Sequence, residues 1–222
     1  MAESRLNSLG RKLDKNPQLK VKYAEGIDDL LRQGYAVKVS KQDINRNDGK
    51  VWYLPHHPVM NPQKEKMRIV FDCAAKHKNT SLNNNVHQGP DLTNKLVGVL
   101  MRFRQEEVAF MADVQAMFHQ VKVKPTDQDV LRFLWWPGGD TSRLPEIYRM
   151  TVHLFGGTWS PSCCTYALQR AVKDFGQGYT EDARRAVEKN FYVDDLLKSV
   201  PSTATAIKLS KKLKGLVGKS RI

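Results

Sequence analysis

Two adjacent aspartates, Asp194 and Asp195, stand between apolar residues on both sides in the stretch 191–200. Asp is uncommon inside β-strands, whose side chains alternate between the two faces of a sheet. A hairpin removes this conflict if residues 191–193 form one strand, the two aspartates form the tip, and residues 196–200 form the returning strand. Carboxylates at such a corner are suitable ligands for Mg²⁺. An ordinary acidic surface turn would show the same pattern, so the pair alone does not decide between the two.

A third carboxylate, Asp113, follows the apolar run 108–112 and precedes a polar and aromatic turn. We expect it to emerge at the end of a strand. If that end meets the hairpin, Asp113 and Asp194 could together hold two divalent cations about 4 Å apart, as in enzymes that transfer phosphoryl groups between oxygens. The alternative is that Asp113 caps the N-terminus of a helix after the strand.

The composition indicates a polyanionic partner. The chain has 222 residues, a formal net charge of +13 and a sequence pI near 9.7. A field of this sign and size is typical of nucleic-acid binding, although a generic basic surface would also produce it. The sequence has no apolar run of membrane-spanning length and no signal-peptide pattern, and its three cysteines lack metal-ligand spacing. We therefore expect a soluble, intracellular, cytoplasmic chain with no membrane partner.

Hydrophobic periodicity predicts a mixed α+β fold with helices packed on a mostly antiparallel sheet. Residues 5–34 read as helical, with Gly34 at the C-terminal cap. Residues 54–58 read as an extended connector, because each proline disfavours the α region for the residue before it. Short strands are predicted at 35–39, 51–54, 67–73, 108–114, 130–136 and 147–152, and further helices near 92–103, 162–175, 181–189 and 203–217.

Four segments, in this order along the chain, resemble the polymerase motifs of reverse transcriptases. They are residues 68–72 (RIVFD), Asp113 followed five residues later by Phe118, Phe155-Gly156 followed by Pro161, and residues 192–195 (YVDD). More narrowly, residues 5–198 resemble the reverse transcriptases of BEL/Pao-type LTR retrotransposons. The segments that carry this second resemblance are 55–58, 68–72, 81–83, 89–90, 100–104, 133–135 and 160–161.

The resemblance implies a right-hand polymerase with fingers and palm, in which Asp113 and Asp194 are the main metal ligands and Asp195 a secondary one. The implied cofactor is a pair of Mg²⁺ ions, with Mn²⁺ as a substitute. Phe118 would be the aromatic gate beneath the sugar of the incoming nucleotide, where a ring excludes a 2′-hydroxyl. Taken without its motif, Phe118 reads as a core aromatic.

The resemblance also implies nucleotide contacts away from the aspartates. Arg68, helped by Lys64 or Lys66, would neutralise the triphosphate, since a guanidinium binds phosphate oxygens bidentately. Either lysine could instead be a solvated charge at a strand edge. Phe155 and Gly156 would lie at the nucleotide base, where the missing side chain of glycine allows the backbone to come close. Ordinary turn chemistry at Gly156 is compatible with that role.

Along the chain, this interpretation predicts N-terminal helices and fingers at 1–107, a palm core with interleaved fingers and helices at 108–200, and a basic C-terminal helix at 201–222. We expect no thumb, and a fragment of a longer polyprotein that also carries protease, RNase H and integrase. The expected activity is RNA-directed DNA polymerisation on an RNA or DNA template–primer with dNTPs, in the setting of a retroelement's virus-like particle. The alternative is an inactive nucleic-acid-binding remnant.

Overall fold

The computed structural model describes residues 1–61 and 66–218, which form two compact units. Unit 1 contains Met1–His87 and Lys122–Thr158, and unit 2 contains Gln88–Val121 and Trp159–Ile222. Every ladder between the named strands is antiparallel. The expected combination of helices with largely antiparallel sheet is therefore confirmed, although the strands form three small sheets rather than one. Within the described residues, no helix is long and apolar enough to cross a membrane.

The N-terminal region contains two helices, α1 (Ala2–Asp14) and α2 (Pro17–Arg32), where the hydrophobic pattern predicted one. The break lies at Asn16, whose side-chain oxygen accepts a hydrogen bond from the Leu19 N–H at 3.1 Å. Asn16 is thus the N-cap of α2, and Pro17 directly after it suits the first helical turn, where no N–H partner is needed. The single helix over 5–34 was wrong because the periodicity continues across this local start signal.

The end of α2 follows the prediction for Gly34, which has φ = 72°. The Gly34 N–H donates to the Leu31 carbonyl at 3.0 Å, and the Tyr35 N–H donates to the Leu30 carbonyl at 2.9 Å. These two bonds define a Schellman motif, which places its glycine in the left-handed region. The motif ends the helix and directs the chain into the first strand.

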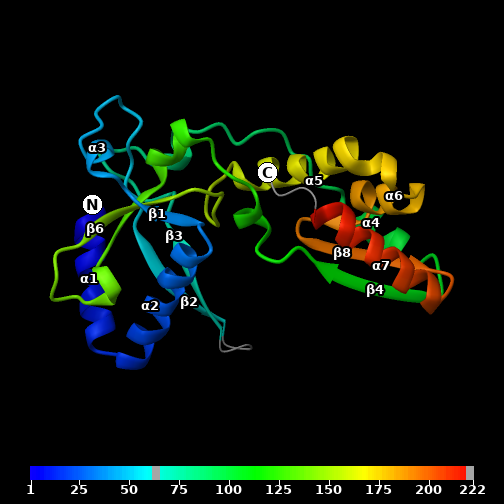
Figure 1. The fold of residues 1–222 in the computed structure, drawn as a ribbon, viewed down its shortest axis with the longest axis horizontal. Coiled ribbons are helices and arrows are strands. Elements are labelled where there is room, and N and C mark those ends of the chain that lie inside the picture. The colour runs from blue at the N-terminus through cyan, green and yellow to red at the C-terminus, as the bar shows by residue number, and fades with distance from the viewer. Residues whose placement is uncertain (62–65, 219–222) are drawn as a thin grey trace. The chain divides into compact units, whose positions relative to one another are not determined.

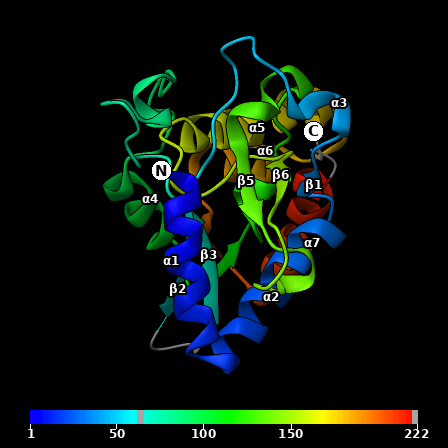
Figure 2. The same ribbon diagram turned by 90° about the vertical axis from the view of Figure 1, so that its left-hand side faces the viewer.

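The described residues of unit 1 form two sheets and one further short helix, α3 (Lys41–Ile44). The first sheet has the order β1 (Ala36–Lys38), β6 (Glu146–Met150), β5 (Arg132–Trp135), and the second pairs β2 (His56–Asn61) with β3 (Lys66–Phe71). Helices α1 and α2 pack against these strands (Figure 2).

Two predictions in this region are corrected. Residues 51–54 form only an isolated bridge at Tyr53, not a strand. The expected connector 54–58 instead enters β2, where Pro58 lies opposite Ile69. A proline lacks only the N–H donor, so it is tolerated in a strand with one unpaired edge.

An aromatic cluster forms the centre of unit 1. Tyr23, Phe133 and Trp135 are almost fully buried, and each has its ring within about 6 Å of the His56 ring. The His56 Nε2 donates to the Leu134 carbonyl at 2.9 Å, so its Nδ1 accepts from the Tyr23 hydroxyl at 2.6 Å. Burial lowers the pKa of His56 to about 4. His56, the first residue of β2, is therefore a neutral structural residue.

A buried ion-pair network holds the loops of unit 1 together. Asp129 is 1% exposed and accepts hydrogen bonds from Arg132 Nε at 2.8 Å, Arg46 at 2.8 Å and Arg149 at 3.1 Å. The fully buried Arg132 also donates to the carbonyls of Ile44 and Asp43. Burial alone would raise the pKa of Asp129, but the hydrogen bonds from the three arginines outweigh it and lower that pKa.

Unit 2 is built on a three-stranded sheet of order β4 (Val108–Asp113), β8 (Asp195–Val200), β7 (Phe191–Tyr192). Its helices are α4 (Leu96–Phe103), α5 (Ser160–Phe175), α6 (Glu181–Lys189) and α7 (Thr203–Gly218). α7 packs against β4, β8, α5 and α6, while α4 contacts β7 and β8 (Figure 1). Short 3₁₀ turns across the chain lie at Leu82–Asn84, Met117–Gln120, Pro125–Leu131, Pro137–Gly139 and Gly176–Gly178.

The alternation of β4 separates two kinds of surface. Phe110 and Ala112 line a pocket with residues of α5 and α7, together with Leu196 of β8. Met111, one position away from both, is 64% exposed. Because neighbouring side chains on a strand point to opposite faces, Asp113 shares the face of Met111. One face of the sheet therefore builds the core, and the other carries Asp113.

Candidate active site

The hairpin that carries the two adjacent aspartates turns one residue earlier than predicted. Tyr192 pairs with Asp195, so the two-residue loop consists of Val193 and Asp194, and Asp195 begins β8. Val193 has φ = 57°. Two-residue hairpin loops need a positive φ at their first position and favour glycine there. A β-branched residue in this conformation costs on the order of 1–3 kcal/mol, so the loop stores strain.

The sheet brings Asp113 directly to this hairpin. Asp113 pairs in register with Asp195 at the end of β4. The Val114 N–H then donates to the carbonyl oxygen of Asp194 at 2.9 Å, which ties the turn to the chain leaving β4. Side chains directly opposite one another in an antiparallel pair share a face, with Cβ atoms about 4.5–5.5 Å apart. Asp113 thus meets the adjacent pair Asp194 and Asp195, which is distant in sequence, at one end of one sheet.

The alternative reading of Asp113 as a helix cap does not hold. The next helical segment, Met117–Gln120, has Ala116 as its N-cap, without a side-chain capping bond. Ala116 has φ = 50°, so the chain between Asp113 and this segment makes a sharp left-handed turn. Asp113 therefore belongs to the strand end.

The electrostatic arrangement of the three carboxylates is unfavourable by itself. Like charges directly opposite in a sheet destabilise the pair, and Asp113 faces Asp195 in this way. Both are exposed and Asp194 is half-buried. No lysine, arginine or histidine among the described residues forms an ion pair with any of them. Although the chain has a net charge of +13, no basic side chain among the described residues pairs with the three aspartates.

The donor set suits a hard divalent cation, which takes oxygen ligands from carboxylates. The side chains are not already gathered into a coordination shell, because the described residues contain no group of three or more His, Cys, Asp or Glu side chains placed to hold a metal ion. The backbone thus assembles the donors, and rotation of exposed side chains would complete the ligand set.

Phe118 lies in the core of unit 2. Its side chain is 9% exposed and belongs to the apolar cluster that includes Met117, Cys164 and Leu168. This position agrees with the core reading of Phe118. Its role as a gate for the nucleotide sugar stays a prediction.

In unit 1, Arg68 lies on the solvent side of β3. The side chains of its neighbours Met67 and Ile69 face α2. A Cβ added to Gly26 of that helix would lie 3.4 Å from Met67 and 2.9 Å from Ile69. Strand alternation then places the exposed Arg68 on the opposite face. Lys64 lies outside the described residues, and so does the side chain of Lys66.

Gly156 is required by its immediate surroundings. It has φ = 102°, and a Cβ built on it would lie 2.5 Å from the carbonyl oxygen of Phe71 at the end of β3. In the structure the group that Gly156 approaches closely is therefore protein backbone. Contact between Gly156 and a nucleotide base stays a prediction. Contact between Phe155, which is 39% exposed, and the base stays a prediction too.

Asn83 is a positioning residue to which the sequence alone assigned no role. Its side-chain amide donates to the Gly156 carbonyl at 3.1 Å, and its side-chain oxygen accepts from the Thr158 N–H at 3.1 Å. Its own N–H donates to the Cys73 carbonyl at 3.0 Å. The loop at 156–158 is thus fixed to the end of β3. In the sequence, Asn83 stood out only as part of the asparagine run 83–85 and of the family-like segment 81–83. Neither pattern indicates that its partner is the loop at 156–158.

Pro161 lies in the first turn of α5, which begins at Ser160. The predicted helices at 162–175 and 181–189 agree closely with α5 and α6.

Comparison with solved structures gives the fold. The prototype foamy virus protease–reverse transcriptase, a selenomethionine-labelled mutant, is 19% identical with a TM-score of 0.65, over 92% of this chain and 23% of that one. A foamy viral protease–reverse transcriptase with double-stranded DNA is 21% identical with a TM-score of 0.63, over 87% of this chain and 28% of that one. The fold is reverse-transcriptase-like. A third structure, with an RNA/DNA hybrid, has 20% identity and a TM-score of 0.63, over 92% and 23% of the two chains.

These similarities establish the fold alone, because the identities are low. The chain spans about a quarter of the length of the reverse-transcriptase-containing proteins that it matches. No family model matches the sequence, and no curated protein does. The narrower resemblance to BEL/Pao elements stays a prediction from the motifs.

Proposed function

We propose that this chain is the RNA-directed DNA polymerase domain of a BEL/Pao-type retrotransposon polyprotein. The observation that carries the proposal is the register of Asp113 opposite Asp195, with Asp194 in the adjoining turn. This arrangement occurs on a reverse-transcriptase-like fold and at the YVDD motif. The proposed parts are the fingers and palm of a right-hand polymerase.

Asp113 and Asp194 are the proposed main ligands of two Mg²⁺ ions, with Asp195 as the secondary carboxylate. Bound cations would activate the primer 3′-hydroxyl and stabilise the leaving pyrophosphate, and Mn²⁺ could replace Mg²⁺. The repulsion between Asp113 and Asp195 supports a cation site, because a divalent ion removes the cost of placing like charges opposite each other. The Val193 turn supports it too, since strained backbone at a rigid hairpin is typical of functional sites.

The other proposed roles concern the incoming deoxynucleotide. Arg68 is exposed and can bind phosphate oxygens through its planar guanidinium. Phe118 would face the sugar, and Phe155 with Gly156 the base. Lys64 and Lys66 are candidates for a further phosphate contact.

The proposed macromolecular partner is an RNA or DNA template–primer. The net charge of +13 supports it, because a basic protein gains affinity by releasing counterions from phosphates. The matched foamy viral proteins are described with double-stranded DNA and with an RNA/DNA hybrid. Protease, RNase H and integrase domains of the parent polyprotein are further proposed partners.

Primer extension tests the function directly. The protein is given a labelled primer on an RNA or a DNA template, with dNTPs and Mg²⁺ or Mn²⁺. Extension should occur with the wild type and fall at least 100-fold in Asp113→Asn and in Asp194→Asn. Asp182→Asn is the matched control, since this exposed aspartate lies in the first turn of α6 in the same unit. It should extend primers like the wild type.

The second candidate function is a non-catalytic nucleic-acid-binding remnant, which the net charge alone would support. It predicts salt-sensitive binding of the template–primer that is equal in the wild type, Asp113→Asn and Asp194→Asn. It also predicts no extension at any protein concentration. That pair of results would overturn the polymerase proposal while leaving nucleic-acid binding in place.

A further inference from the structure

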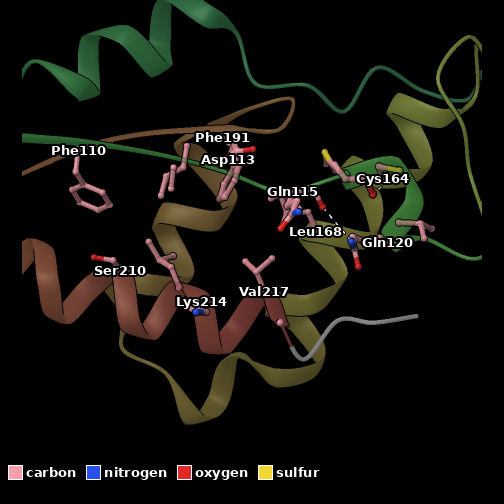
Figure 3. A pocket seen from close by; sticks show the side chains of 18 residues that line it. Phe110, Asp113, Gln115, Gln120, Cys164, Leu168, Phe191, Ser210, Lys214 and Val217 are labelled. Atoms are coloured by element: carbon pink, nitrogen blue, oxygen red, sulfur yellow. Dashed lines mark hydrogen bonds between the residues drawn. The ribbon is translucent and has the colours of Figure 1, made fainter. Parts of the chain in front are cut away.

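A pocket of about 520 Å³ lies between the unit 2 sheet and helices α5 and α7, on the face of the sheet that carries Phe110 and Leu196, with Asp113 at its rim (Figure 3). Its walls come from β4, β7 and β8, from the segment after β4, and from α5 and α7. All of them belong to unit 2. The volume is within the range of about 300–1,000 Å³ that is typical of small-molecule sites. Among the described residues that line it, Asp113 has a role proposed above, whereas the cavity itself has none.

The sheet side of the pocket is apolar and continuous. Ala112 pairs with Leu196, and Leu196 pairs with Phe191, so the three side chains form one row across the sheet. Phe110 extends this row along β4 on the same face. Ala112 is exposed although its neighbours in the row are buried, because its small side chain meets the pocket rather than another side chain. A cavity lined in this way favours an apolar ligand, ideally one with rings.

The helix side adds a cation. Lys214 of α7 lines the pocket, is exposed, and forms no ion pair with any described residue. Asp113 borders the pocket at its rim, where β4 ends, and its charge would disfavour an anion at that end. The two charges therefore orient a ligand: a negative group is favoured at α7, and apolar rings lie against β4 and β8.

We propose that this pocket is a binding site for a small, mainly apolar ligand that has linked or fused rings and one anionic group. The rings would pack against Phe110, Ala112, Phe191 and Leu196. The anion would pair with Lys214. Because β4 forms one wall and ends at Asp113, an occupant would contact the strand that carries this carboxylate.

The probe for the test is 8-anilinonaphthalene-1-sulfonate, which has the required rings and a single sulfonate. Its binding to the full chain is followed by fluorescence and by calorimetry, which gives the stoichiometry. The proposal predicts one molecule bound per chain. Nucleotides, metal ions and nucleic acid are absent, so the result does not depend on polymerase activity.

Two substitutions on one strand separate the pocket from the rest of the surface. Ala112→Phe places a ring in the pocket and should weaken probe binding at least tenfold. Ala109→Phe introduces the same ring on the opposite face of β4, three positions earlier, and should leave the affinity unchanged. Equal affinity in these two variants, or no saturable binding to the wild type, would overturn the proposal.

Two substitutions on α7 test the charge. Lys214→Gln should weaken binding of the sulfonate about threefold to tenfold, whereas Lys208→Gln, at an exposed position on the same helix, should not. These glutamine variants keep the helix and the core intact, so they decide the matter even if Ala112→Phe fails to fold. Equal weakening in both would show general attraction of an anion to a basic helix and would contradict the assigned site.

Discussion

Replacing Gly156 by alanine should be one of the most destabilising single-methyl changes in unit 1. Two costs add at this position. The backbone has φ = 102°, a conformation that costs a residue with a Cβ on the order of 1–3 kcal/mol. The new Cβ would also lie 2.5 Å from the Phe71 carbonyl oxygen, which belongs to backbone and cannot rotate away. Relieving such an overlap costs about 1–3 kcal/mol. We expect a total loss of roughly 3 kcal/mol or more.

Gly34→Ala is the control that separates the two costs. Gly34 lies in the same unit with φ = 72°, and a Cβ built there meets no atom within 4 Å. Its substitution therefore carries only the backbone cost, about 1–2 kcal/mol. Both variants are compared with the wild type by urea unfolding, followed by tryptophan fluorescence, because Trp52, Trp135 and Trp136 all lie in unit 1.

The loss in Gly156→Ala should exceed the loss in Gly34→Ala by at least 1 kcal/mol. Equal losses in the two variants would refute the contact between the 156–158 loop and the end of β3. A larger loss in Gly34→Ala would refute it as well.

Three further predictions concern polar groups in unit 1. Asp129→Asn removes the charge that compensates the fully buried Arg132, so it should cost about 3–5 kcal/mol in urea unfolding; a loss below 1 kcal/mol would contradict the network. The pKa of His56 is about 4 in the folded protein, against an ordinary histidine value of 6.5, so the unfolded chain binds more protons between these two pH values. The contribution of neutral His56 to the free energy of unfolding should be fully present above pH 6.5 and should decrease by about 3 kcal/mol as the pH falls to 4. His56→Gln should remove this pH dependence. Asn83→Ala removes the acceptor of the Thr158 N–H, so hydrogen exchange at that amide should accelerate severalfold; unchanged protection would argue against the clamp.

Much of the local structure could be predicted because its causes are local. The apolar run 108–112 and the hairpin pattern at 191–200 located β4 and β8, and Gly34 ended α2 through a motif of consecutive residues. Even the failed helix over 5–34 carried its correction in the sequence, as Asn16 followed by a proline. Each of these features depends on residues within about one helical turn.

The remaining features depend on partners that are distant in sequence. The aspartates could be recognised as a set, but the opposition of Asp113 and Asp195 follows from the register of two strands, which no local pattern fixes. Gly156 could be recognised as a close-approach residue, whereas its actual neighbour, Phe71, lies far away in the chain. The Asp129 network had no signal at all, since its arginines come from three separate segments.

Binding of Mn²⁺ is the measurement that tests the central claim most directly. Free and bound Mn²⁺ are separated by electron paramagnetic resonance during a titration of the protein with a dNTP present. Asp113→Asn and Asp194→Asn should each weaken Mn²⁺ binding at least tenfold relative to the wild type, and Asp182→Asn should not. Equal Mn²⁺ affinity in the wild type and all three variants would contradict a metal site at the strand end and hairpin of unit 2.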